Sequence, residues 1–427
     1  MKRSYLIGGL LGGMLCGCQA NAARPEYSAL APLPEANAKL GFTCVHETIP
    51  EASAETDEVF QYARWLQKNN QLKQDKVVDV EIERLYRVAA ENGHFKANIN
   101  LQNGAMRGQF KLRGAEHLRL SQDLIDAGVA TGYYFIGNFL QQGAAGLEQD
   151  PEMSLRYYRK AADQGNAQAQ AYVADKLAPI DIAPDVARQM RSCAVEQGNG
   201  LAARALGINL STKGRFQEAL EAFQLGVAAG DETAAYALEQ GFRGPLSDNR
   251  LHYLGQPQDI ERAERYKEIG KVLGGYSYAD PKVPEIHEIL PLPPAKLPPW
   301  DGKLQWLEAR LANVAPPKPT DALINELAQA KLLEPATGKP MPGSPAFIKA
   351  SSPAPTCHSG QACPQSGYWQ AWRLTDASQA SLQDGAVRHF DEGEILPTQS
   401  VERHHRRFLR ADTTTVEDEI VEWRLLG

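Results

Sequence analysis

The chain has 427 residues, of which 43% are hydrophobic and 23% are charged, and these are the proportions of a folding chain rather than a disordered one. Its length allows two or three ordinary domains, or one extended solenoid with a further domain attached. The formal net charge of −7 provides no overall basic field for a nucleic-acid backbone, so we expect no nucleic-acid partner.

Residues 1–18, MKRSYLIGGLLGGMLCGC, have the features of an export signal. A basic start is followed by an apolar stretch that is shorter than the roughly 20 residues needed to span a bilayer. The ending from Leu15 to Cys18 resembles the lipobox of bacterial lipoprotein signal peptides. This resemblance implies that Cys18 is lipidated and becomes the mature N-terminus, with an ordinary secretory signal as the alternative. Gln19 after it implies sorting to the outer membrane, so we expect a periplasmic, lipid-anchored protein.

Residues 19–40 are small, polar and proline-bearing, which is typical of a tether. Residues 41–80 are predicted to cap the helical body that follows. Within them GFTCVHE could form a short strand, and Asp57 to Asn70 predicts an amphipathic helix. Together with LYRVAAENGHFKANINLQN, this helix resembles an uncharacterised domain of bacterial repeat lipoproteins.

A glycine that interrupts a helical pattern returns at intervals of 35, 37, 33 and 32 residues. Such a period predicts a helical solenoid. Each glycine is predicted to end one helix in the left-handed conformation. Four positions later a small residue lies one turn into the next helix, where it permits close helix packing. The glycines are Gly93, Gly128, Gly165, Gly198 and Gly230, and the small residues are Ala97, Gly132, Ala169, Ala202 and Ala234.

The clearest unit runs from residue 130 to 165. Asp150 is predicted as the N-cap of its second helix and Pro151 as the first helical residue. Leu155, Tyr158, Ala161 and Ala162 would then share one buried face. The unit resembles the Sel-one-like repeat, a relative of the tetratricopeptide repeat. The resemblance implies a mainly α fold, an α/α solenoid of helical hairpins over residues 81–274, in which the repeat residues are structural and carry no chemistry.

Residues 275–342 are rich in proline and predict an extended strap along the surface, with two short helices in LQWLEARLANV and DALINELAQAKLLE. A docking motif for proline-reading domains is the alternative to a structural strap.

Residues 343–427 alternate large apolar and polar residues between turn signals, which predicts a small β-rich domain. Cys357 and Cys363 enclose five loop-forming residues and are predicted to form a disulfide, with a zinc site that uses His358 as the rival. Whether Cys44 pairs with Cys193, or both stay free thiols, is left open by the sequence. The string CPQSGYWQAW resembles a C-terminal module of bacterial lipoproteins and immunity proteins.

The sequence contains none of the catalytic motifs HExxH and GxSxG and no phosphate loop, and its only glycine-rich run lies within residues 1–18. His404 and His405 alternate in direction if they lie on a strand, so a solvated basic edge is favoured over a metal site. The aromatic run from Tyr133 to Phe135 is interpreted as core. We therefore expect no enzyme activity, no cofactor and no metal.

Helical-repeat lipoproteins of this kind resemble immunity proteins that are paired with phospholipase effectors of type VI secretion. The resemblance implies a protein partner, a secreted lipase or phospholipase toxin, and membrane contact only through the N-terminal lipid. The alternative is an envelope scaffold or regulator of cell-wall or secretion machinery. The residues that contact the partner are not predicted.

Overall fold

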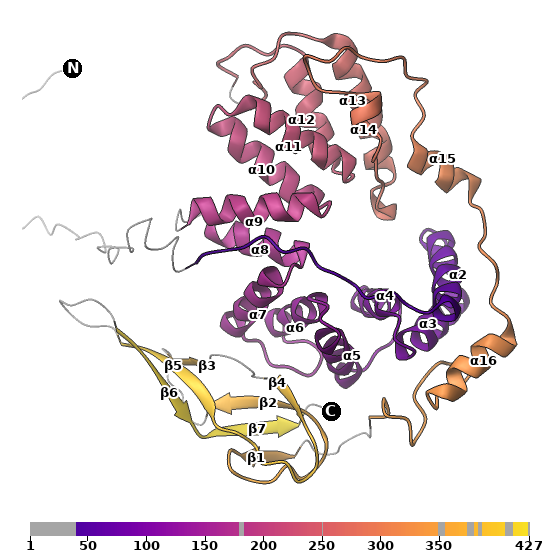
Figure 1. Ribbon diagram of the computed structural model, residues 1–427, viewed down its shortest axis with the longest axis vertical. Coiled ribbons are helices and arrows are strands. Elements are labelled where there is room, and N and C mark those ends of the chain that lie inside the picture. Colours follow the sequence, from indigo (N-terminus) through magenta and orange to yellow (C-terminus); the bar gives the residue numbers. More distant parts are fainter. Residues whose placement is uncertain are drawn as a thin grey trace, which may run out of the picture.

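The computed structural model describes residues 40–178, 183–249, 251–348, 355–373, 380–382, 387–405 and 413–425. Within these ranges the chain forms fifteen α-helices, one 3₁₀ helix and seven strands, with the strands confined to the C-terminal part (Figure 1). None of the described helices is both long enough and apolar enough to cross a membrane.

Twelve helices build a curved solenoid in which each helix packs against the next along the chain (Figure 1). The predicted boundary at residue 81 falls inside a helix, because α3 already begins at Lys76. The helices are α2 (Ala54–Asn70), α3 (Lys76–Glu91), α4 (Phe95–Met106), α5 (Gly114–Asp126), α6 (Thr131–Gln142), α7 (Pro151–Asp163), α8 (Ala167–Leu177), α9 (Pro184–Glu196), α10 (Gly200–Thr212), α11 (Phe216–Ala228), α12 (Glu232–Phe242) and α13 (Ile260–Gly275).

Helix α7 shows how the repeat sequence sets its local structure. Asp150 accepts a hydrogen bond from the backbone N–H of Met153 at 2.9 Å, and the helix begins at Pro151, as predicted. Tyr158, Ala161 and Ala162 are buried, but Leu155 is 41% exposed, contrary to the expectation. The phase of the predicted face was wrong by part of a turn, because the helix also buries Met153, Ser154 and Tyr157.

The proline-rich strap runs from α13 back to the first two helices of the solenoid (Figure 1). It contains a 3₁₀ helix (Ser277–Ala279), α14 (Ile286–Ile289), α15 (Gln305–Ala312) and α16 (Asp321–Ala330). Ile324 and Ala328 of α16 are buried in the same apolar cluster as residues of α2 and α3. The indole N–H of Trp65 donates to the carbonyl oxygen of Asn313 at 3.4 Å. The strap therefore links the two ends of the solenoid.

The C-terminal part forms two antiparallel sheets. The strand order is β1-β7-β2-β4 in one sheet and β3-β5-β6 in the other. The pairing of Trp369 in β2 with Leu425 in β7 fixes one register, and that of Val401 in β5 with Glu417 in β6 fixes another. The strands are β1 (Thr356–His358), β2 (Gly367–Arg373), β3 (Ala380–Leu382), β4 (Val387–Phe390), β5 (Gln399–His405), β6 (Thr413–Glu419) and β7 (Val421–Leu425).

The two sheets share one apolar core with the solenoid. Trp369 and Trp423, which are fully buried, lie in the same cluster as Phe135, Phe139 and Leu118 of α6 and α5. An ion pair of 2.9 Å between Arg156 of α7 and Glu402 of β5 adds a polar contact between the parts. The β-rich part is thus packed on the solenoid over α5–α7 rather than attached only through the strap.

Candidate partner-binding surfaces

The five repeat glycines all lie two residues beyond the end of a helix, at φ between +75° and +107°. Four of the small residues that follow are alanines with at most 2% of their surface exposed. At the fifth, Gly132, an added Cβ would lie 2.4 Å from the carbonyl oxygen of Ser121. These positions have the conformation and close packing that the repeat pattern requires, and they belong to the scaffold.

Sequence reasoning missed the residue directly after the glycine. In four repeats its side chain caps the next helix by accepting a hydrogen bond from the backbone N–H of the buried alanine. A polar residue placed between glycine and a new helix was the available signal. These caps are His94, Asn166, Asn199 and Asp231.

An extended stretch of residues 40–53, which we call the N-terminal segment, lies across the solenoid on its way to α2 (Figure 1). It contains no strand, so the possible strand in GFTCVHE is not formed. The backbone N–H of Glu47 donates to the carbonyl oxygen of Gly165 at 3.2 Å and to Oε1 of Gln197 at 3.0 Å. The carboxylate of Glu47 accepts hydrogen bonds from the Thr131 hydroxyl at 2.8 Å and from Asn166 at 3.4 Å.

A disulfide fixes this segment covalently. Cys44 of the N-terminal segment is bonded to Cys193 of α9, across 149 positions of sequence. The sequence left this pairing open. The predicted bridge between Cys357 and Cys363 is wrong, since both are free thiols in the structure. Cys357 lies in β1 opposite Trp423, while Cys363 is buried beyond the following turn, with its Sγ 3.1 Å from the carbonyl oxygen of Gln365.

Two other predicted features cannot be placed. Cys18 lies outside the described residues, and the side chains of His404 and His405 are likewise not described, although their backbone ends β5. The aromatic run of α6 is core at Phe135, which is 1% exposed, while Tyr133 and Tyr134 are half-buried.

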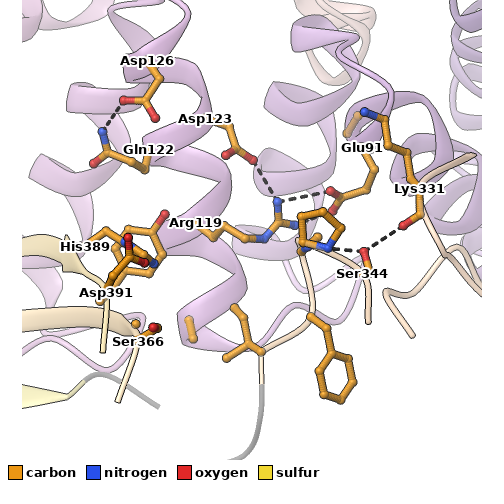
Figure 2. A pocket seen from close by; sticks show the side chains of 18 of the residues that line it. Glu91, Arg119, Gln122, Asp123, Asp126, Lys331, Ser344, Ser366, His389 and Asp391 are labelled. Atoms are coloured by element: carbon orange, nitrogen blue, oxygen red, sulfur yellow. Dashed lines mark hydrogen bonds and ion pairs between the residues drawn. The ribbon is translucent and has the colours of Figure 1, made fainter. Parts of the chain in front are cut away.

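A cavity of about 1310 Å³ lies where the solenoid, the end of the strap and the β-rich part meet. Figure 2 shows its polar lining from α3, α5, the strap and the loop after β4. Arg119 occupies its centre and forms ion pairs with Glu91 and, at 2.9 Å, with Asp123. On the side of the β-rich part, the rings of Tyr368 and His389 meet edge to face, with centroids 5.1 Å apart.

Several carboxylates lie close together in this cavity and affect the pKa of Asp123. Burial raises the pKa of Asp123 to about 6, and the nearby charges of Glu91 and Asp126 act in the same direction against the attraction of Arg119. Burial also raises the pKa of the Tyr368 hydroxyl. Asp123 is therefore partly protonated near pH 6, and the cavity becomes more negative as pH rises.

The serines of the cavity are occupied by backbone hydrogen bonds. The Ser344 hydroxyl donates to the carbonyl oxygen of Lys331 at 2.8 Å, and Ser366 accepts from the backbone N–H of Glu392 at 2.8 Å. Within the described residues neither hydroxyl is hydrogen-bonded to a histidine or a carboxylate, so neither has the partner that activates a serine nucleophile. The cavity offers polar binding groups and ion pairs.

Two family models match parts of the chain. A Sel1 repeat matches residues 130–166, and a domain of unknown function, DUF6396, matches residues 234–341. The second match covers α12, α13 and most of the strap, whereas the sequence resemblance placed an uncharacterised domain at the N-terminal helices. In the structure α12, α13 and the strap share one apolar cluster, which includes Tyr266, Ile286 and Leu304.

No curated protein matches this chain. Among solved structures it is similar to three proteins of Pseudomonas aeruginosa. PA5086 has 27% identity over 59% of this chain and 95% of that chain, with a TM-score of 0.46. Immunity protein Pa5087 has 23% identity over 59% and 95%, with a TM-score of 0.47. Immunity protein PA5088 has 22% identity over 60% and 95%, with a TM-score of 0.47.

The matched repeat, the positive φ of the five glycines and the buried residues four positions later agree with one another. Solenoids of this class present extended surfaces for binding other proteins. Residues 130–166 match the Sel1 repeat, and the helical body of the chain is a solenoid of helical hairpins of the Sel1 type.

Proposed function

We propose that this protein is a non-catalytic immunity protein of the bacterial periplasm, which binds a type VI secreted lipase or phospholipase toxin and blocks its action. The class of partner comes from the sequence resemblance, and two of the solved proteins above carry the name immunity protein. The lipid on Cys18 would hold the solenoid at the outer membrane, where an incoming toxin passes.

The observation that supports the proposal most is the Cys44–Cys193 disulfide within a Sel1-type solenoid. Disulfides are stable in oxidising compartments such as the periplasm and are rare in the cytosol. The bond therefore agrees with the export signal in residues 1–18. A solenoid supplies the broad surface that a tight protein complex needs, which is about 1,200 to 2,000 Å² in total.

The test is a periplasmic protection assay. Lipases and phospholipases encoded beside this gene are directed to the periplasm of a host that makes the full chain, no chain, or a chain lacking residues 1–18. We expect growth to be rescued only by the exported chain, and the toxin to co-purify with it. The form without residues 1–18 is the matched control, because it keeps the whole solenoid sequence but stays in the wrong compartment.

The proposal is refuted if no neighbouring toxin binds and if deletion of the gene leaves cells equally resistant to attack by sister cells. An envelope scaffold or regulator of cell-wall or secretion machinery is then the function to test next. Retention of the membrane anchor in Cys18→Ser, judged by fractionation, would separately contradict the lipoprotein part of the proposal.

A further inference from the structure

Four side chains that can bind a metal ion meet where the N-terminal segment crosses α9. Cys44 and His46 come from the segment, and Cys193 and Glu196 lie one turn apart on α9. One ligand atom from each of Cys44, His46 and Cys193 lies within 4.8 Å of the other two. Oε2 of Glu196 lies 3.0 Å from Nε2 of His46 and 3.8 Å from Sγ of Cys44.

These separations are close to those between the ligands of a tetrahedral zinc ion. With Zn–N near 2.0 Å and Zn–S near 2.3 Å, tetrahedral neighbours lie about 3.3 Å apart for nitrogen and oxygen, and about 3.8 Å apart for two sulfurs. The pairs formed by Glu196 with His46 and with Cys44 already fall near this range. The bonded sulfurs of Cys44 and Cys193 are the pair that must separate, and they can do so once the disulfide is reduced.

The surroundings allow an ion to enter and be held. His46 and Glu196 have 49% and 60% of their side-chain surface exposed, so the site opens to solvent on that side. Cys193 is buried on the other side, in the last turn of α9. Two thiolates, one imidazole and one carboxylate are ligands that zinc accepts. They come from the N-terminal segment and α9, which are also joined by the hydrogen bond from the backbone N–H of Glu47 to Gln197, the C-cap of α9.

We propose that, when the Cys44–Cys193 disulfide is reduced, Cys44, His46, Cys193 and Glu196 bind one Zn²⁺ ion that replaces the covalent bond. A dithiol reductant supplies two electrons and two protons to the disulfide and is itself oxidised to a disulfide. Zn²⁺ then displaces the two thiol protons as the two Zn–S bonds form. The N-terminal segment stays fastened to α9 in both states, and its release requires reduction together with removal of the metal.

Cobalt binding tests the proposal directly. The full chain without residues 1–18, carrying Cys357→Ser and Cys363→Ser to remove the other two thiols, is reduced with a dithiol and freed of reductant without oxygen. Co²⁺ is then titrated, since it reports tetrahedral geometry and thiolate bonding by its absorption, and Zn²⁺ is used to displace it. We expect one ion per chain, with thiolate-to-cobalt bands that vanish when Zn²⁺ is added.

Variants of the ligands separate this site from adventitious binding. Cys44→Ser should abolish the thiolate bands expected of two sulfurs, and His46→Ala and Glu196→Gln should each weaken Zn²⁺ binding about tenfold or more, with unchanged far-UV circular dichroism. Gln189→Ala is the matched control, because Gln189 is an exposed residue of the same helix and lies outside the ligand set. The proposal is overturned if the reduced chain binds no Co²⁺, or if His46→Ala binds it as tightly as the parent. A bound ion in the oxidised chain would also contradict it.

Discussion

Substitution of Gly165 by alanine should loosen the N-terminal segment from the solenoid. Gly165 has φ of +107°, and a Cβ there would lie 2.5 Å from the backbone nitrogen of Glu47 and 2.6 Å from the carbonyl carbon of His46. The left-handed conformation costs an alanine about 1 to 2 kcal/mol. Overpacking against backbone that cannot rotate away adds about 1 to 3 kcal/mol. We therefore expect a total destabilisation of about 2 to 5 kcal/mol.

Gly198 provides the matched control. It ends α9 as Gly165 ends α7, with φ of +77°, but nothing lies within 4 Å of a Cβ at that position. Gly198→Ala should therefore cost only the conformational part, about 1 to 2 kcal/mol. The difference in unfolding free energy between Gly165→Ala and Gly198→Ala measures the contact with the N-terminal segment, because the general cost of replacing a left-handed glycine is common to both variants.

Hydrogen exchange measured by mass spectrometry locates the effect. In Gly165→Ala the amide of Glu47 should lose protection, because its carbonyl acceptor at residue 165 is displaced. The disulfide keeps the segment nearby, so loss of protection should be confined to residues close to position 47. Equal destabilisation by the two variants, with unchanged exchange in residues 40–53, would show that the segment does not rest on Gly165.

Three further predictions concern the scaffold. Ala169→Leu, at a fully buried position, should cost about 1 to 3 kcal/mol, whereas Gln168→Leu on the exposed face should be nearly neutral; equal unfolding midpoints would contradict this. Burial lowers the pKa of His117 to about 4 from its ordinary 6.5. As pH falls from 6.5 to 4, His117 therefore takes up a proton in the unfolded chain before it does so in the folded one, and the free energy of unfolding should fall by about 3 kcal/mol. Urea unfolding of His117→Gln should lack this part of the pH dependence, and an unchanged dependence would refute the assignment. Replacing Cys44 and Cys193 by serine opens a loop of 149 positions and should cost at most about 5 kcal/mol, measured without reductant; stability equal to the parent would mean that the bond does not form in solution.

The parts of the fold that could be predicted are those set by residues close together in the sequence. A glycine that ends a helix and a small residue four positions later lie within one hairpin, so their spacing carries the signal. The cap at Asp150 and the start of α7 at Pro151 are local in the same way. The burial of Leu155 was mispredicted because burial depends on which neighbouring helix covers the face, and periodicity does not contain that information.

The candidate sites could not be predicted, because each is made of segments far apart in the sequence. The Cys44–Cys193 pair is separated by 149 positions, and a short Cys-x5-Cys spacing was preferred over it. Cys357 and Cys363 are free thiols although they belong to one apolar cluster, with Cys357 in β1 opposite Trp423 of β7 and Cys363 beyond the following turn. The cavity joins Arg119, Ser344 and Tyr368 from three regions of the chain, and only the packing of the β-rich part on α5–α7 brings them together.

The five glycine turns are equivalent in the sequence repeat, but they have different surroundings in the structure. The turn at Gly165 is covered by the N-terminal segment. The turn at Gly230 is covered by the strap, since a Cβ there would lie 2.0 Å from the carbonyl oxygen of Pro281, and the backbone N–H of Val283 donates to the carbonyl oxygen of Ala228 at 2.9 Å. A Cβ at Gly93, Gly128 or Gly198 would meet nothing within 4 Å among the described residues. These three glycines are exposed, although beside Gly93 the side chain of Asn92 donates to the carbonyl oxygen of Leu327 in the strap at 3.0 Å. The segments outside the repeats therefore decide which turns along this edge of the solenoid stay exposed.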